Sequence, residues 1–501
     1  MIIDRNWAKS SGGGDNTKLK EIIEGNITEI TAEDLEGVEK IGDSSFREKK
    51  TLEKVSLPTT VKDIETYSFY YCSALSELDL NEGLENIGSN AFAYTALKNI
   101  HIPSTVKTLG PSAFERIQNN RIESFTFAEN SQLETIGSSV LSGAYVVSEG
   151  FRLDLPDTVK SIGKYAFRVN SGNIDYVRMP NSIESVAAET VPASYKSKMN
   201  QYGNGYYFDN ETNPYIVYFD KVDATASSIT IHKDCKVIAG HEQRTNTTLT
   251  DIIFEEGSAL ETIGYESFYK HTALANIIFP ETLKRIEQSA FKGCTGLTEV
   301  IIPNGVTTID QQAFSGCTGL TRIVLPENLT KVTNAMCGTL SNLTELVFNC
   351  RNCEDAGTDV NARTQWLRNI GTNTDGVHVI FTDSVEHIPA YSFYNGLSDL
   401  SKINKVTIGN NVKTIGDYAF GALNITEIEL PSTIERIGNW ALYSSALATI
   451  TINATTPPII QANTLHSNTT TIRIPAGTLE AYSTATNWAR YADKFVELPA
   501  E

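Results

Sequence analysis

The residues of this chain that could do chemistry are scattered, and their spacing fits none of the common catalytic motifs. The sequence contains no G-x-S-x-G, H-E-x-x-H, Walker loop, G-x-G-x-x-G or EF-hand pattern. Its seven histidines include no pair at i, i+4 that could bind a metal ion from one helix face. We therefore expect no enzyme activity, no metal site and no cofactor.

The seven cysteines do not predict a disulfide framework. Cys72, Cys294 and Cys317 each follow a repeated phenylalanine by three residues, in a column where a thiol packs as a small hydrophobic group. Cys350 and Cys353 form the one C-x-x-C motif. Without a second pair or a nearby pair of histidines, this motif indicates a local surface disulfide or two free thiols in place of a zinc site.

A column of carboxylates is the first candidate binding surface. Each member stands at the same place in its repeat, and Lys54 and Arg322 interrupt the column. Neighbouring carboxylates would concentrate negative potential that could hold a cation or a basic partner. The alternative is an ordinary solvated face. The acidic members are Glu77, Asp251, Glu299, Glu345 and Glu427.

A tyrosine-rich segment is the second candidate. Tyr202, Tyr206 and Tyr207 belong to a stretch in which YYFD, NETNP and YIVYFDK predict a hairpin around an Asn/Pro turn. Tyrosine together with asparagine and glycine suits contacts with sugars and protein surfaces. The alternative is that these rings pack onto the adjacent coils.

One short unit, repeated every 22 to 27 residues, must position all these side chains. Its best copies, such as 75–92, 274–291 and 297–314, follow L-x-x-I-x-I/L-P-x-x-V-x-x-I-G-x-x-A-F-x-x-C. L-x-x-I-x-I predicts a strand, which the following proline ends because it has no N–H to donate. V-x-x-I predicts a second extended piece. G-x-x-A-F predicts a tight turn and about one helical turn.

A large apolar residue follows the isoleucine of I-G by five places in nearly every repeat. This fixed spacing predicts that one side chain from each coil enters the same site of the core. Burial of each contributes roughly 1.5–3 kcal/mol. The phenylalanines of this core column are Phe46, Phe69, Phe92, Phe114, Phe167, Phe268, Phe291, Phe314, Phe393 and Phe420.

The repeat resembles the BspA-like (Treponema-type) leucine-rich repeats of bacterial surface proteins over about residues 26–475. The resemblance implies a repeat solenoid: a right-handed superhelix of short parallel strands with turns and short helices, capped at both ends. It also implies display outside the cell and adhesion to host matrix, host cells or other bacteria.

The period divides the chain into a continuous solenoid with two insertions and two ends. The expected parts are an N-terminal segment with a Gly-rich link and short capping helix (1–25), repeats (26–191), a Tyr-rich hairpin insertion (192–228), repeats (229–349), an insertion with the C-x-x-C motif and a helix (350–380), repeats (381–475) and a C-terminal helical cap (476–501).

Composition limits the classes of partner. The net charge is −19 and no Lys/Arg cluster is present, so nucleic acid and anionic membranes are poor partners. The sequence contains no run of 18 apolar residues, so we expect no membrane-spanning helix. The leading hypothesis is a non-enzymatic recognition or adhesion scaffold, extracellular or surface-displayed, that binds proteins or glycans on host or bacterial surfaces.

Two alternatives remain open from the sequence. No signal-peptide h-region is visible, and the opening segment also resembles repeat proteins of gut phages and prophages. That second resemblance implies a tail-associated, receptor-binding virion protein. The other alternative is an intracellular protein-interaction scaffold.

Overall fold

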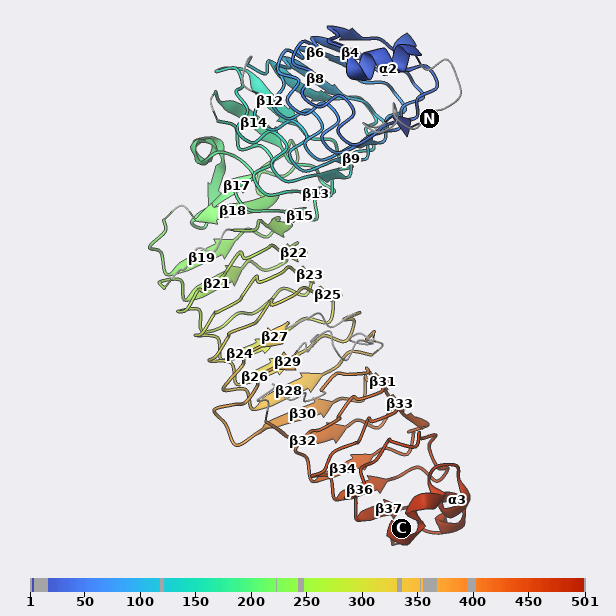
Figure 1. The fold of residues 1–501 in the computed structure, drawn as a ribbon. Helices are drawn as coiled ribbons and strands as arrows, with labels where there is room; N and C mark the ends of the chain where they lie inside the picture. Colours follow the sequence, from blue (N-terminus) through green and yellow to red (C-terminus); the bar gives the residue numbers. More distant parts are fainter. Residues whose placement is uncertain are drawn as a thin grey trace. The chain divides into compact units, whose positions relative to one another are not determined.

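The computed structural model describes residues 2–3, 17–117, 121–170, 172–221, 223–241, 247–330, 336–351, 353–354, 367–393 and 402–499. The chain forms two compact units, here called unit 1 (Met1–Val222 with Asp234–Glu242) and unit 2 (Asp223–Lys233 with Gln243–Glu501). Within each unit, short strands of successive repeats stack in parallel (Figure 1). The repeat solenoid predicted from the sequence is confirmed.

Unit 1 pairs equivalent strands of consecutive repeats. The V-x-x-I segments of seven repeats form a sheet of β3 (Lys40–Ile41), β5 (Asp63–Ile64), β7 (Asn86–Ile87), β9 (Thr108–Leu109), β11 (Thr135–Ile136), β13 (Ser161–Ile162) and β15 (Ser185–Val186). The N-terminal strand β1 (Ile2–Ile3) pairs with β3 and is the eighth strand of this sheet. The L-x-x-I-x-I segments form shorter sheets: β2 (Glu29–Ile30), β4 (Lys54–Ser56) and β6 (Glu77–Asp79); β8 (Asn99–Ile102) and β10 (Ser124–Phe127); β12 (Phe151–Asp154) and β14 (Ile174–Arg178).

The Tyr-rich insertion closes unit 1 as a three-stranded antiparallel arrangement, followed by one parallel strand. Its strands are β16 (Asn200–Tyr202), β17 (Gly205–Phe208), β18 (Val217–Lys221) and β20 (Val237–Ile238). The hairpin between β17 and β18 holds the NETNP turn. A second, tighter hairpin between β16 and β17 turns at Gly203 and Asn204, whose φ angles are 52° and 67°.

Unit 2 repeats the same two strand positions. The L-x-x-I-x-I strands are β19 (Ser228–Ile231) and β21 (Asp251–Phe254); β24 (Glu299–Ile301), β26 (Arg322–Val324), β28 (Glu345–Phe348), β30 (Val377–Phe381) and β32 (Ile403–Ile408); β34 (Glu427–Leu430), β36 (Thr449–Ile452), β37 (Thr471–Ile474) and β38 (Phe495–Glu497). The V-x-x-I strands are β22 (Thr262–Ile263), β23 (Arg285–Ile286) and β25 (Thr308–Ile309), and β31 (His387–Ile388), β33 (Thr414–Ile415) and β35 (Arg436–Ile437). A separate pair, β27 (Cys337–Gly338) and β29 (Leu367–Arg368), forms where the other coils have the core-column turn.

The G-x-x-A-F segments differ from the expected helical turn. In the described coils they form hydrogen-bonded turns, because residues in the left-handed region, such as Ser44 (φ 57°) and Glu48 (φ 63°), interrupt any α-helix. The N–H of Phe46 between them donates to the carbonyl oxygen of Ser68 in the next coil, at 2.8 Å. These turns therefore add a third line of hydrogen bonds that joins the coils.

The phenylalanines of the core column line the interior of the coils. All ten are buried, and rings stack where adjacent coils both carry a phenylalanine of the column. Phe69 and Phe92 have ring centroids 5.2 Å apart at 3°, and Phe291 and Phe314 have centroids 5.4 Å apart at 3°. Stacked rings with no exposed surface fix the spacing of the coils.

The ends of the chain cover the terminal coils. Helix α2 (Thr17–Glu24) buries Ile22 and Ile23, while the Gly-rich link before it lies outside the described residues. The C-terminal cap is only partly helical. Helix α3 (Leu479–Thr484) and the 3₁₀ segment η3 (Ala489–Lys494) precede strand β38, which pairs with β37. Two further 3₁₀ segments are η1 (Glu33–Leu35) and η2 (Ala193–Lys198).

The insertion expected at 350–380 holds a strand where part of a helix was predicted. Leu367–Arg368 form β29, which pairs in parallel with β27, while residues 355–366 lie outside the described residues. Among the helices that the structure describes, none is long and apolar enough to cross a membrane.

Candidate interaction surfaces

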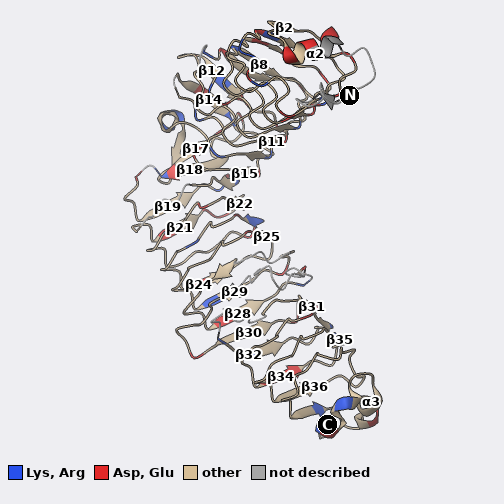
Figure 2. Cartoon of the chain, in the orientation of Figure 1, with Lys and Arg blue, Asp and Glu red and all other residues tan. Residues whose placement is uncertain are grey.

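The carboxylate column alternates with cations where the coils pair. On the solvent side of β24, β26 and β28, the Arg322 guanidinium lies between two carboxylates, 2.5 Å from Glu299 and 2.6 Å from Glu345. In unit 1, Lys54 faces Glu77 in the ladder and forms an ion pair of 3.3 Å with Glu29. Acidic and basic positions are interspersed along both units (Figure 2). Lys54 and Arg322, which interrupt the column in the sequence, therefore pair with carboxylates of neighbouring coils, and the column is a ladder of mixed charge at these coils.

The two remaining carboxylates of the column have different surroundings. Asp251 on β21 accepts a hydrogen bond from the hydroxyl of Thr250 and lies beside Ser228 in the ladder. Glu427 on β34 lies in a polar groove with Lys405 on the preceding coil. The structure thus does not bring the five predicted carboxylates together into one site.

Packing accounts for most of the tyrosine-rich segment. Tyr207 has no exposed surface, and its ring contacts Tyr215 and Tyr218 edge to face at centroid distances of 5.5 and 5.4 Å. Tyr202 and Tyr206 are half-buried, and the Lys196 ammonium lies 5.5 Å from the centroid of the Tyr206 ring. A fully buried Tyr207 cannot touch a partner, so its predicted role in binding gives way to a role in the core.

The loop between β17 and β18 is tied to the preceding coil by two residues. The Asn210 side chain donates to the Met179 carbonyl oxygen at 3.0 Å and accepts from the N–H of Asn213 at 2.8 Å. Next to it, Arg178 donates to the carboxylates of Asp157 and Glu211, at 2.9 and 2.8 Å. These bonds lower the pKa of both carboxyl groups below the ordinary range.

The cysteines are buried free thiols. The Sγ atoms of Cys72 and Cys317 donate to carbonyl oxygens of the preceding coil at 3.1 Å, and burial raises the pKa of both thiols to about 12. Of the two alternatives for Cys350 and Cys353, the structure shows two free thiols, which are buried, in place of a surface disulfide. The Cys350 Sγ donates to the Leu329 carbonyl oxygen at 2.6 Å. Thiols in such surroundings are unreactive packing groups.

Unit 2 carries a row of aliphatic side chains at outward strand positions that was not predicted from the sequence. We call it the apolar stripe. Its members occupy the middle position of I-x-I, which points to solvent because the flanking positions are buried. They are Ile253, Ile278, Ile301, Val324, Val347 and Ile380. Ile278 is 85% exposed, Ile301 53% and Ile253 50%, whereas Val324 and Ile380 are half-buried and Val347 is buried, with 9% of its surface exposed.

The register of the strands shows that the stripe is continuous over the paired coils. Ile301 lies beside Val324 in the ladder, Val324 beside Val347, and Val347 beside Ile380. Ile253 and Ile278 hold the same place in the two preceding repeats. The charged ladder of Glu299, Arg322 and Glu345 runs along one side, two residues earlier on the same strands.

The fold itself does not require aliphatic residues at this position. In the other repeats the same place is polar or charged, and β-branched threonine there satisfies strand preference equally well. These equivalents are Ser56, Asp79, His101, Thr126, Asp154, Arg178, Thr230, Thr407, Glu429, Thr451 and Arg473. The one aliphatic equivalent among the described strands outside the stripe is Val496 on the capping strand β38. The signal was present in the sequence, where strands such as 252–254 and 300–302 are apolar at three consecutive positions.

Comparison with known proteins agrees with the repeat architecture. A family model described as a BspA type leucine rich repeat region matches residues 39–151, 147–200, 226–366 and 372–486, in six copies. No enzymatic family is indicated. No curated protein matches the chain.

Several solved structures are similar at low identity. The pneumococcal vaccine antigen PcpA is 20% identical, with a TM-score of 0.33 over 74% of this chain and 84% of that chain. A leucine-rich repeat protein from Bacteroides ovatus is 18% identical, with a TM-score of 0.25 over 94% and 84%. The T. pallidum leucine-rich repeat protein is 24% identical, with a TM-score of 0.27 over 32% and 78%.

The family assignment rests on the family model, which matches most of the chain. It agrees with the recurring I-G-x-x-A-F unit and with the stacked parallel strands that this unit forms. The chain belongs to the family of BspA-type leucine-rich repeat proteins, whose solenoids are scaffolds for interaction.

Proposed function

We propose that this protein is a non-enzymatic recognition scaffold that acts outside the producing cell and binds a protein on a host or bacterial surface through the apolar stripe. The single observation that carries the proposal is the stripe itself. Six successive repeats place an aliphatic side chain where most other repeats place a polar one, and Ile253, Ile278 and Ile301 are at least half exposed. An exposed, contiguous apolar surface rimmed by polar residues marks an interaction site in a protein that must remain in solution.

The surroundings of the stripe favour a protein as its occupant. Partner side chains that are apolar would cover Ile278 and Ile301, and charged groups at their margin would meet the Glu299–Arg322–Glu345 ladder. This combination of an apolar centre and a charged rim is typical of protein interfaces. The charges of Glu299, Arg322 and Glu345 lie beside the stripe and would repel a partner with like charges at its margin. This repulsion contributes specificity.

The test uses fluorescently labelled full-length protein and a panel of gut bacteria, epithelial cells and immobilised matrix proteins. We expect wild type to stain one class of surface and Ile278→Asp to lose that staining, because a carboxylate would have to be buried. Thr126→Asp is the matched control, since Thr126 holds the same strand position in unit 1. It should stain as wild type does.

Three outcomes would contradict the proposal. The first is that wild type stains nothing at micromolar concentration, and the second is that Thr126→Asp loses staining as fully as Ile278→Asp. A wild-type dimer in solution that Ile278→Asp converts to a monomer would show that a second copy of the chain occupies the stripe. Each result removes a surface protein as the partner of the stripe.

A further inference from the structure

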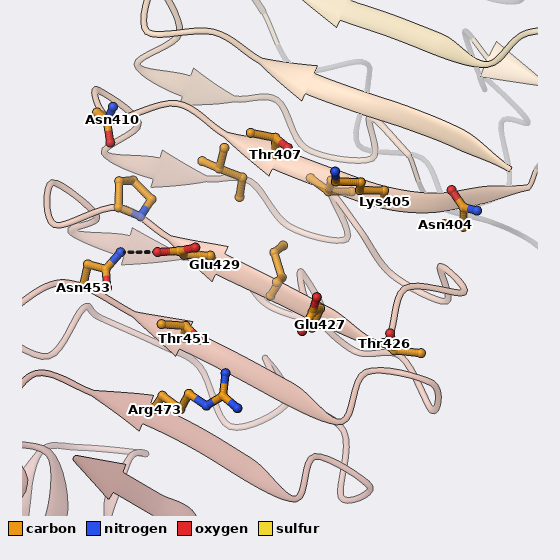
Figure 3. A pocket seen from close by; sticks show the side chains of 14 residues that line it. Asn404, Lys405, Thr407, Asn410, Thr426, Glu427, Glu429, Thr451, Asn453 and Arg473 are labelled. Carbon is orange, nitrogen blue, oxygen red and sulfur yellow. Dashed lines mark hydrogen bonds between the residues drawn. The ribbon is translucent and has the colours of Figure 1, made fainter. Parts of the chain in front are cut away.

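A polar groove lies where two sheets of unit 2 meet. Strand β32 is the last of a five-stranded sheet and β34 the first of a four-stranded sheet, so among the described strands no ladder joins these neighbours. The groove has a volume of about 760 Å³ and runs over β32, β34, β36 and β37 (Figure 3). Its floor includes Val406 and Ile428, which are buried. Its walls are polar side chains from four successive coils.

The charges in this groove are not paired with one another. Farther along the same sheet face, Arg322 pairs with the carboxylates of both neighbouring coils. Lys405 and Glu427 are also opposite charges on neighbouring coils, yet neither forms an ion pair with any described residue. Arg473, at the other end of the groove, has no carboxylate partner among the described residues either. The interruption of the sheet thus leaves charged groups available to a ligand.

The middle of the groove accepts hydrogen bonds. Glu429 lies between the two cations along the coils and accepts a hydrogen bond from the Asn453 amide at 2.8 Å (Figure 3). One Glu429 oxygen and the Glu427 carboxylate remain as acceptors, and the Thr451 hydroxyl can donate or accept. The Thr407 hydroxyl already shares a hydrogen bond of 2.8 Å with the His378 ring. A fitting ligand must therefore carry an anionic group for a cation and many hydrogen-bond donors for the carboxylates.

We propose that this groove is a second binding site, distinct from the apolar stripe, for an oligosaccharide that carries a carboxylate. The sugar carboxylate pairs with Lys405 or Arg473, and ring hydroxyls donate to Glu427 and Glu429. An acidic peptide fits less well, because its further carboxylates would be repelled by Glu427 and Glu429. A polyanion is also disfavoured, because the chain carries a net charge of −19.

The residues that line the groove determine which interactions can hold the sugar. The groove contains no aromatic ring among its described lining residues, so affinity comes from hydrogen bonds and ion pairs without stacking. Such contacts remain largely solvated and are weakened by salt. The expected dissociation constant is therefore near the weak end of specific recognition, about 1 mM.

The test is calorimetric titration of the full-length protein with 3′-sialyllactose, and with lactose as the neutral sugar. We expect binding of 3′-sialyllactose that weakens as salt is raised, and lactose binding about tenfold weaker, because a charge-assisted hydrogen bond is lost. Lys405→Gln or Arg473→Gln should lower affinity by a similar factor. Arg436→Gln is the control, because Arg436 is an exposed cation on the other sheet, outside the groove.

Four results would overturn the proposal. These are no binding of 3′-sialyllactose at about 10 mM, equal binding of lactose, binding that Lys405→Gln and Arg473→Gln both leave unchanged, and binding of hexaglutamate in preference to the sugar. Because Ile278→Asp lies outside the groove, it should bind 3′-sialyllactose as wild type does. Failure of this site and failure of the apolar stripe are therefore separately observable.

Discussion

Phe314 and Ile278 are both large apolar side chains of unit 2, yet Phe314 has no exposed surface and Ile278 is 85% exposed. Their positions in the repeat explain the difference. Phe314 stands five residues after an isoleucine whose side chain also enters the core, whereas Ile278 stands between two buried strand residues. Composition does not separate these roles, but position in the repeat does, and each role predicts a different response to substitution.

Phe314→Ala should destabilise the surrounding coils by about 3–5 kcal/mol, because the stacked column cannot collapse into the space left by the ring. Urea unfolding followed by circular dichroism measures this loss. Ile459→Ala is the control, since Ile459 is 64% exposed, and it should change stability by no more than about 0.5 kcal/mol. Equal unfolding midpoints for Phe314→Ala and wild type would contradict the core assignment.

The thiols should be unreactive in the folded protein. Burial raises the pKa of Cys72, Cys235 and Cys317 to about 12, so the reactive thiolate is scarce at any pH at which the protein is handled. We expect iodoacetamide at pH 8.5 to modify no described cysteine of the native chain and all seven cysteines after unfolding. Mass spectrometry gives the count. Rapid modification of Cys350 or Cys353 in native protein would contradict their buried position.

Arg178 should make part of the stability depend on pH. Its hydrogen bonds lower the folded-state pKa of Asp157 and Glu211, so their contribution is present above the ordinary carboxyl pKa. That contribution is lost as pH falls through the lowered values, between about pH 5 and pH 2. Thermal unfolding of Arg178→Gln should therefore vary less with pH in this range than that of wild type. If the unfolding temperatures of wild type and Arg178→Gln changed equally with pH, Arg178 would not be coupled to these two carboxyl groups.

At the scale of elements, the strands could be predicted from the repeat but the turns could not. Alternation and proline marked the strands, because both act through the local backbone. The turn after I-G was expected to be helical, yet Tyr67 and Tyr71 adopt φ angles of 58° and 62° and the intervening Phe69 N–H donates to the next coil. Backbone hydrogen bonds between successive coils determine this conformation, and the sequence of a single repeat does not predict them.

The hairpin insertion likewise combines a feature that the local sequence predicts with one that depends on residues far apart in the sequence. Its antiparallel pairing of β17 with β18 follows from the NETNP turn. Its attachment to the preceding coil follows from Asn210 and Arg178, which lie 32 residues apart in the sequence and act on the same loop. No local pattern identifies such a clamp.

Asn210→Ala should loosen the hairpin, because it removes two side-chain donors and leaves backbone groups of the turn without their acceptor. The expected cost is about 1–3 kcal/mol. Hydrogen exchange should accelerate in 205–221 and remain unchanged in the coils 285–325 of unit 2. Acceleration in both regions, or in neither, would show that Asn210 does not hold the hairpin.

At the scale of the whole molecule, the fold supplies the scaffold and the exposed positions supply any specificity. The family could be inferred from the repeat because every copy carries the same core residues. The interaction surfaces could not be inferred in the same way. Glu299 and Glu345 were predicted to belong to an acidic column that Arg322 interrupts, but the ion pairs of Arg322 with both carboxylates depend on contacts between coils. The apolar stripe emerges only when equivalent outward positions of all repeats are compared.

The measurement that tests the central claim most directly is hydroxyl-radical footprinting of the protein on the surface it stains. Exposed aliphatic side chains are oxidised in free protein, and a bound partner protects those that it covers. We predict protection of Ile253, Ile278 and Ile301 on binding, with Ile459 and Val496 oxidised equally in both states. If Ile278 were oxidised as fully in the bound protein as in the free protein, recognition through the apolar stripe would be contradicted.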